Sequence, residues 1–221
     1  MLIFSPNMLK TFSDCPQKYI FKYVEKISVP QNTSKFEKGK KVHALAHYFL
    51  RGDDISKLEQ GLNEDEKKTW KTLKNNEFFQ KKYVNSEYNL ACKIGNYMVG
   101  GRLDALMTDD IEAGQDKNIF NSLCILDYKT GTPPNNPERD FQTMVYLMCV
   151  FKFFGQTKDL KFVYIDLKNN GNKTVEFNDE LKILYEKTLV AVCDKITSYI
   201  PCENIKHSNR CNFCEYKKIC R

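Results

Sequence analysis

The sequence has no apolar run long enough to cross a membrane. The longest one extends from Met144 to Phe154 and is interrupted by Lys152, whereas a spanning helix needs roughly 18 apolar residues. Met1 to Pro6 contain no basic region ahead of an apolar core, so we expect no secretory signal and a cytoplasmic protein. Internal repeats and low-complexity linkers are also lacking. The sequence therefore favours a single domain over residues 1–221.

The composition is that of an ordinary globular protein with a mild excess of positive charge. Of the 221 residues, 42% are hydrophobic and 28% are charged, and the net charge is +6. This balance is compatible with a polyanionic partner but does not require one. Nine cysteines are many for a reducing compartment, which disfavours disulfides. Four of them lie singly in apolar stretches and are expected to behave as small hydrophobic residues: Cys92, Cys124, Cys149 and Cys193.

Hydrophobic periodicity and capping residues predict an α/β protein. Helices are expected from Ser5-Pro6 to about residue 26, from the capping box at residues 34–37 to Gly52, over 63–80, from Asn136-Pro137-Glu138 to Gly155, and from Asn178 to Pro201. Strands are expected over 83–93, 97–108, 123–129, 160–167 and 174–177, with turns at Gly95-Asn96 and Asn169-Asn170-Gly171.

Two apolar-flanked segments each place a carboxylate on an expected strand. They are Gly101-Arg102-Leu103-Asp104 and Ile125-Leu126-Asp127-Tyr128-Lys129. Because strand side chains alternate, Asp127 and Lys129 point to one face and Tyr128 to the other. Two carboxylates beside a lysine make a poor core but a good site for a hard divalent cation such as Mg²⁺. For an isolated D-x-K triplet, two edge-strand aspartates and a solvated lysine are the better explanation, and the upstream Gly101-Arg102-Leu103-Asp104 makes the two explanations about equal.

Two helices carry polar pairs at a spacing of four residues. His43 and His47 share one helix face, which would suit a zinc pair, but no acidic third ligand follows on that helix. Gln142 and Tyr146 also stand on one face. Taken alone, a histidine at this place is better explained as a surface or hydrogen-bonded core residue, and Gln142 and Tyr146 are better explained as a polar stripe on an amphipathic helix.

The ordered series of these motifs resembles the RecB-like branch of the PD-(D/E)XK nuclease superfamily. The series is Gly39-x-x-x-His43, Gly101-Arg102-Leu103-Asp104, Asp127-Tyr128-Lys129 and Gln142-x-x-x-Tyr146. The opening, with Ser5-Pro6 and Cys15-Pro16-Gln17-Lys18-Tyr19, is similar to that of RecB/AddB nuclease domains and of CRISPR-associated RecB-like exonucleases. The resemblance covers nearly the whole chain. It implies a restriction-endonuclease-like core, with a mixed central sheet between helices.

The resemblance also implies roles for individual residues. His43, Asp104, Asp127 and the Tyr128 carbonyl would bind Mg²⁺ or Mn²⁺, and Lys129 would be the catalytic lysine. Gln142 and Tyr146 would complete the catalytic set by positioning the DNA and the lysine. Relatives often have a glutamate four residues after the motif histidine, where this chain has His47. Glu87 is a possible substitute for that acidic group, although an exposed strand glutamate explains it equally well.

The last eleven residues contain three cysteines: Cys211, Cys214 and Cys220. Such clustering suits a tetrahedral zinc or an iron–sulfur cluster, and the fourth ligand could be Cys15, Cys202 or His207. The alternative is a tail with reduced thiols. The resemblance favours Cys15 and a 4Fe–4S cluster, which would join residues 1–30 to residues 202–221 around a nuclease core of residues 31–201.

Lysines interleaved with aromatic residues suggest a surface for single-stranded nucleic acid. The expected DNA contacts are Lys38, Lys40, Lys41, Arg102, Gln142 and Tyr146. The predicted function is a metal-dependent exonuclease on single-stranded DNA ends. Two alternatives are a DNA-end-binding subunit that depends on a helicase or a CRISPR integrase, and a zinc-stapled binding module. The sequence has no helicase motif, so any unwinding would require a partner.

Overall fold

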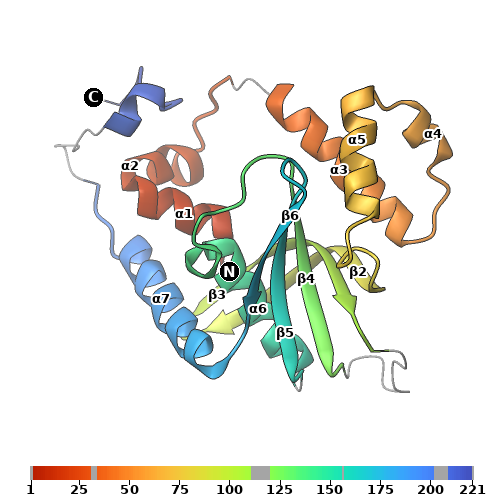
Figure 1. Ribbon diagram of the computed structural model, residues 1–221. Coiled ribbons are helices and arrows are strands. Elements are labelled where there is room, and N and C mark those ends of the chain that lie inside the picture. Colours follow the sequence, from red (N-terminus) through yellow and green to blue (C-terminus); the bar gives the residue numbers. More distant parts are fainter. Residues whose placement is uncertain (1, 31–33, 111–119, 156, 202–208, 221) are drawn as a thin grey trace.

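A mixed sheet of six strands forms the centre of the protein (Figure 1). The computed structural model describes residues 2–30, 34–110, 120–155, 157–201 and 209–220, with the backbone alone at 34–38, 209 and 210. The strands are β1 (Ile3–Phe4), β2 (Lys82–Ile94), β3 (Tyr97–Thr108), β4 (Ser122–Lys129), β5 (Asp159–Asp166) and β6 (Gly171–Glu176). All five predicted strands are confirmed. β1 was not predicted, because two residues are too few to show a period.

The topology brings the end of β4 beside the middle of β3. β3 pairs antiparallel with β2 along one edge. Along its other edge it pairs with β1 near its start and antiparallel with β4 near its end. β4 and β5 are parallel and are connected through the helix α6 (Phe141–Phe154), and β5 continues into the antiparallel β6. Asp104 and Asp127 are therefore carried by neighbouring strands.

Helices cover both faces of the sheet and enclose two apolar clusters. On one face lie α1 (Pro6–Asp14), α6 and α7 (Asp179–Thr197), and on the other lie α3 (Ser34–Leu50) and α5 (Glu64–Lys74). β4 shows the division: Leu123 and Ile125 belong to the first cluster, whereas Leu126 and Tyr128 belong to the second. Asp127 consequently faces α6, as the strand period predicts. No helix within the described residues is long and apolar enough to cross a membrane.

The first predicted helix is interrupted. Cys15 has an extended backbone (φ −162°) at the end of α1, and Pro16 begins the short helix α2 (Pro16–Tyr19), which continues as a π-helical segment (Ile20–Val24). The break follows from Cys15-Pro16, because the residue before a proline is driven away from helical geometry. The capping box expected at residues 34–37 lies outside the described side chains.

The predicted start of α6 was wrong. Pro137–Arg139 form a separate 3₁₀ turn, and α6 begins after Asp140, whose carboxylate accepts a hydrogen bond from the Gln142 backbone N–H at 2.9 Å. Asp140, rather than Asn136, is therefore the helix cap. The helix predicted over 63–80 is α5 and ends at Lys74, although its cap at Asn63 is confirmed. A further helix, α4 (Ser56–Gln60), was not predicted.

Candidate active site

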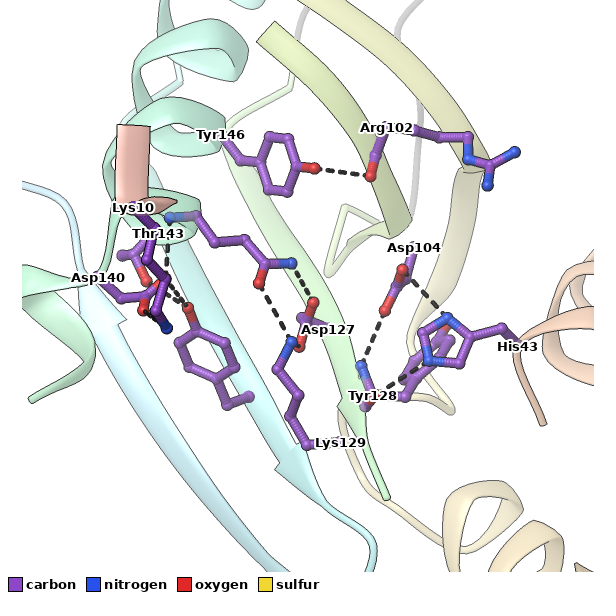
Figure 2. Close-up of polar contacts among 12 residues, drawn as sticks. Lys10, His43, Arg102, Asp104, Asp127, Tyr128, Lys129, Asp140, Thr143 and Tyr146 are labelled. Atoms are coloured by element: carbon purple, nitrogen blue, oxygen red, sulfur yellow. Dashed lines mark hydrogen bonds and ion pairs between the residues drawn. The ribbon is translucent and has the colours of Figure 1, made fainter. Parts of the chain in front are cut away.

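A cleft of about 610 Å³ opens where the middle of β3 and the end of β4 meet the first turns of α1 and α6. Most of the predicted catalytic side chains line it, together with residues of α1. These side chains come from α1, α3, β3, β4 and α6, and Figure 2 shows them converging on the same space. The lining includes Ser5, Lys10, His43, Arg102, Asp104, Asp127, Lys129, Gln142 and Tyr146.

Asp127, Lys129 and Gln142 form one half of the site. The Lys129 Nζ lies 2.6 Å from Asp127 Oδ2 and 3.1 Å from Gln142 Oε1, while Gln142 Nε2 donates to Asp127 Oδ1. Asp127 is only 3% exposed, and its Oδ2 makes no hydrogen bond despite the ion pair. Burial and the charge of Asp104 raise the pKa of Asp127 to about 6, against the opposing effect of Lys129. Gln142 thus holds both partners of a buried ion pair.

His43 and Asp104 form the other half. His43 Nδ1 lies 3.2 Å from Asp104 Oδ1, and its Nε2 lies 3.0 Å from the Tyr128 carbonyl oxygen. Asp104 Oδ2 accepts a hydrogen bond from the Tyr128 N–H at 3.0 Å. Burial alone would lower the pKa of His43, but the hydrogen bond with Asp104 and the charges of Asp104 and Asp127 raise this pKa to about 9. The Tyr128 backbone therefore connects the two halves of the site.

Glu87 extends the acidic group. In the β2–β3 register its neighbours Ser86 and Tyr88 pair with Ala105 and Leu103, so Glu87 stands opposite Asp104. Its φ is +49°, which is uncommon for a residue other than glycine, and such conformations are enriched at functional sites. Ligand atoms of His43, Glu87 and Asp104 lie within 4.8 Å of one another, whereas Asp127 is not part of this group. The three side chains that the structure brings together are therefore His43, Glu87 and Asp104, whereas the expected side-chain ligands were His43, Asp104 and Asp127.

The expected DNA contacts differ in their placement. Tyr146 donates its hydroxyl to the Arg102 carbonyl oxygen at 2.8 Å, and Arg102 reaches outward to pair with Glu87 at 2.8 Å (Figure 2). Lys40 is exposed, while Lys41 pairs with Glu66 of α5 at 2.8 Å. The side chain of Lys38 lies outside the described residues. The roles of these lysines stay predictions.

His47 does not join His43 in a common site. Its Nδ1 lies 2.7 Å from the Ser86 hydroxyl, and Arg51 approaches its Nε2 at 3.5 Å. The two histidines therefore turn to separate partners, and within the described residues they share no zinc-like group of three ligand atoms.

Sequence reasoning missed a second polar network in the cleft. Asp140 accepts a hydrogen bond from the Tyr164 hydroxyl at 3.2 Å and lies 3.6 Å from the Lys10 Nζ. Thr143 contacts the same hydroxyl at 2.9 Å. Asp140 could have been recognised as a cap, because it directly precedes the apolar run of α6. No pattern in the sequence indicates that Lys10 of α1 lies beside it.

The C-terminal cysteines lie against the N-terminal helices. Near the end of the chain, Glu215 pairs with Lys18 at 2.9 Å and the Tyr216 ring packs on Phe21 with centroids 5.4 Å apart, which places the blue segment of Figure 1 beside α2. Burial and the nearby thiols of Cys15, Cys211 and Cys214 raise the pKa of Cys220. No three of these four sulfur atoms come within 4.8 Å of one another. Cys202 and His207 lie outside the described residues.

Comparison with known proteins agrees with this architecture. The family model of the PD-(D/E)XK nuclease superfamily matches residues 3–221. A protein from Eubacterium rectale described as a candidate exonuclease superimposes with a TM-score of 0.58 at 10% identity, covering 96% of this chain and 87% of its own. The structure named SSO0001 gives a TM-score of 0.48 at 15% identity, over 99% and 85% of the two chains. A search of curated proteins gave no significant match.

At 10% identity the first likeness shows the fold alone, and that fold is the mixed sheet flanked by helices described above. The family match extends over almost every residue and includes both strands that carry the cleft carboxylates. The chain therefore belongs to the PD-(D/E)XK nuclease superfamily and is a nuclease enzyme.

Proposed function

We propose that the protein is a metal-dependent exonuclease that hydrolyses single-stranded DNA from its ends. The observation that carries this proposal is the convergence of Asp104, Asp127 and Lys129 on one cleft. The chemistry of the donors fits Mg²⁺ or Mn²⁺: carboxylate oxygens dominate, and a buried oxygen of Asp127 makes no hydrogen bond. The cleft is also lined by Lys10 and Arg102, whose exposed cationic side chains are placed to contact the phosphates of a DNA strand.

In this proposal Asp104, Asp127, His43 and the Tyr128 carbonyl hold the cation, and Glu87 adds a further oxygen. The bound cation would supply an activated water and polarise the phosphate. Lys129, anchored by Asp127 and Gln142, neutralises charge that develops on the phosphate in the transition state. Arg102 is largely exposed at the edge of the site and is placed to contact a flanking phosphate.

We extend the proposal to the RecB-like branch and to a 4Fe–4S cluster on Cys15, Cys211, Cys214 and Cys220. The contacts of Glu215 with Lys18 and of Tyr216 with Phe21 support this extension, because they bring the segment that carries Cys214 and Cys220 beside the helical residues that follow Cys15. Residues 1–30 and 202–221 would form the cluster-binding part and residues 31–201 the nuclease core, within one cytoplasmic domain. Iron and sulfide analysis of protein purified without oxygen tests this extension separately.

The central test is Mn²⁺-dependent degradation of end-labelled single-stranded DNA. Wild type should degrade it, Lys129→Ala should not, and the matched control Lys187→Ala, an exposed lysine of α7, should behave as wild type. The position of the label gives the polarity. If folded wild type binds DNA but does not cut it, the exonuclease proposal falls, and the subunit that depends on a helicase or integrase partner becomes the better account.

A further inference from the structure

Cys92 of β2 and Cys149 of α6 meet inside the protein, although 56 residues separate them in the sequence. Their Sγ atoms are 3.4 Å apart. Cys149 is 1% exposed and Cys92 is 7% exposed. Both belong to the apolar cluster between the sheet and α6. The two other buried cysteines, Cys124 and Cys193, serve as internal references.

The surroundings make the two thiols unequal. The Cys149 thiol can donate to Cys92 Sγ or, at 3.6 Å, to the Val99 carbonyl oxygen. This hydrogen bond lowers the pKa of Cys92. Burial raises the same pKa and so opposes the effect, whereas the charge of Lys152 lowers it further. The same contact raises the pKa of Cys149. Cys92 is thus both the more exposed thiol and the better nucleophile.

We propose that Cys92 and Cys149 are an oxidation site, which hydrogen peroxide converts into an intramolecular disulfide. The Cys92 thiolate attacks the peroxide O–O bond, forms a sulfenic acid and releases the other oxygen as hydroxide, which is protonated to water. The Cys149 sulfur then attacks the Cys92 sulfur, loses its proton and expels the hydroxyl group as a second water. Two thiols are oxidised by two electrons and one molecule of hydrogen peroxide is reduced.

The disulfide needs only a small movement. A disulfide bond is about 2.05 Å long, so the sulfur atoms approach by about 1.4 Å from their present separation of 3.4 Å. The bond would join α6 to β2 and close a loop of 58 residues. Cys149 lies seven residues after Gln142, or about 10 Å along the helix axis. The linkage therefore fixes the helix against the sheet at a distance from the cleft, and this proposal does not depend on the nuclease proposal.

The experiment treats the intact protein, purified without oxygen, with hydrogen peroxide, blocks the remaining thiols and maps the peptides without reduction. We expect a Cys92–Cys149 cross-linked peptide that dithiothreitol removes. The thermal midpoint of the oxidised protein should rise by roughly 5–15 °C. Cys149→Ala should stop at a Cys92 sulfenic acid, which dimedone traps, whereas Cys193→Ala should form the same cross-link as wild type.

Two results would overturn the proposal. The first is that peroxide oxidises other cysteines of the wild-type protein while Cys92 and Cys149 stay reduced. This test uses only the wild-type protein, so it does not depend on whether a variant folds. The second is a cross-link that forms as fast with oxidised glutathione as with hydrogen peroxide. The narrow access to Cys92, with 7% exposure, should exclude the bulkier oxidant from the folded protein.

Discussion

Replacing Gly101 by alanine should damage the cleft through a single contact. A methyl group on Gly101 would lie 3.0 Å from the Tyr146 hydroxyl oxygen, 3.2 Å from its Cε1 and 3.4 Å from Pro6 Cδ. Carbon contacts are most favourable at about 3.5–4.0 Å, so the tyrosine ring must move. It has little room, because Tyr146 is 6% exposed and stacks on Phe162 with centroids 6.4 Å apart.

The expected loss follows from that crowding. Displacing the ring breaks the 2.8 Å hydrogen bond from Tyr146 to the Arg102 carbonyl, two residues before Asp104. Overpacking of this kind costs about 1–3 kcal/mol, equivalent to a decrease of roughly 2–12 °C in Tm for a chain of this length. If the whole cost is expressed at the reacting centre, kcat/KM falls about 5–150-fold.

The assay compares DNA cleavage and thermal unfolding of Gly101→Ala with those of Gly131→Ala. Gly131 also lies close to the site in the sequence, but a methyl group there would meet no atom within 4 Å, so this control should resemble wild type. Adding Tyr146→Phe removes the 3.0 Å contact, and the double variant should lose less than the sum of the single losses. Additive losses, or a Gly101→Ala protein that matches Gly131→Ala in both assays, would refute the reasoning.

Three further substitutions test the surrounding structure by thermal unfolding. Asp140→Ala removes the cap of α6 and should cost about 1 kcal/mol, whereas Asp140→Asn should retain most of the stability; equal losses would contradict the capping role. Lys18→Met breaks the partly exposed pair with Glu215 and should cost less than about 1 kcal/mol; a larger loss would mean that this pair holds the C-terminal segment. Gly100→Ala forces a methyl group onto the Leu90 carbonyl oxygen and should cost about 3 kcal/mol or more; a stable variant would show that the β2–β3 hairpin can move apart.

The sequence predicted the parts of the site that depend on local periodicity. The period of two in β4 placed Asp127 and Lys129 on one face and Tyr128 on the other, and the ion pair at 2.6 Å follows from it. The hairpin at Gly95-Asn96 was also predictable, because a two-residue hairpin turn requires a positive φ and glycine adopts it readily. Gly95 has this positive φ in the structure. Local patterns were thus sufficient for the strands and for the order of the carboxylates.

Packing between distant elements could not be predicted, whereas the register of the predicted hairpin could. The two-residue turn at Gly95-Asn96 already places Glu87 opposite Asp104, although the unusual φ of Glu87 leaves no signal in the sequence. The approach of Lys10 to Asp140 and of Cys92 to Cys149 requires the packing of helices onto the sheet. Neither of these last two pairs shares a sequence period, since each joins two elements that are far apart in the chain.

The site also has an internal balance of charge that affects how its variants are interpreted. Each carboxylate in it is paired with one cationic side chain: Asp104 with His43, Asp127 with Lys129 and Glu87 with Arg102. A divalent cation must therefore compete with a side chain for every carboxylate that it binds. Lys129→Ala removes one competitor, so this variant should bind Mn²⁺ at least as tightly as wild type while losing cleavage. A parallel loss of Mn²⁺ affinity would instead mean that Lys129 maintains the cation site, and only the combination of tight binding with lost cleavage identifies it as the catalytic lysine.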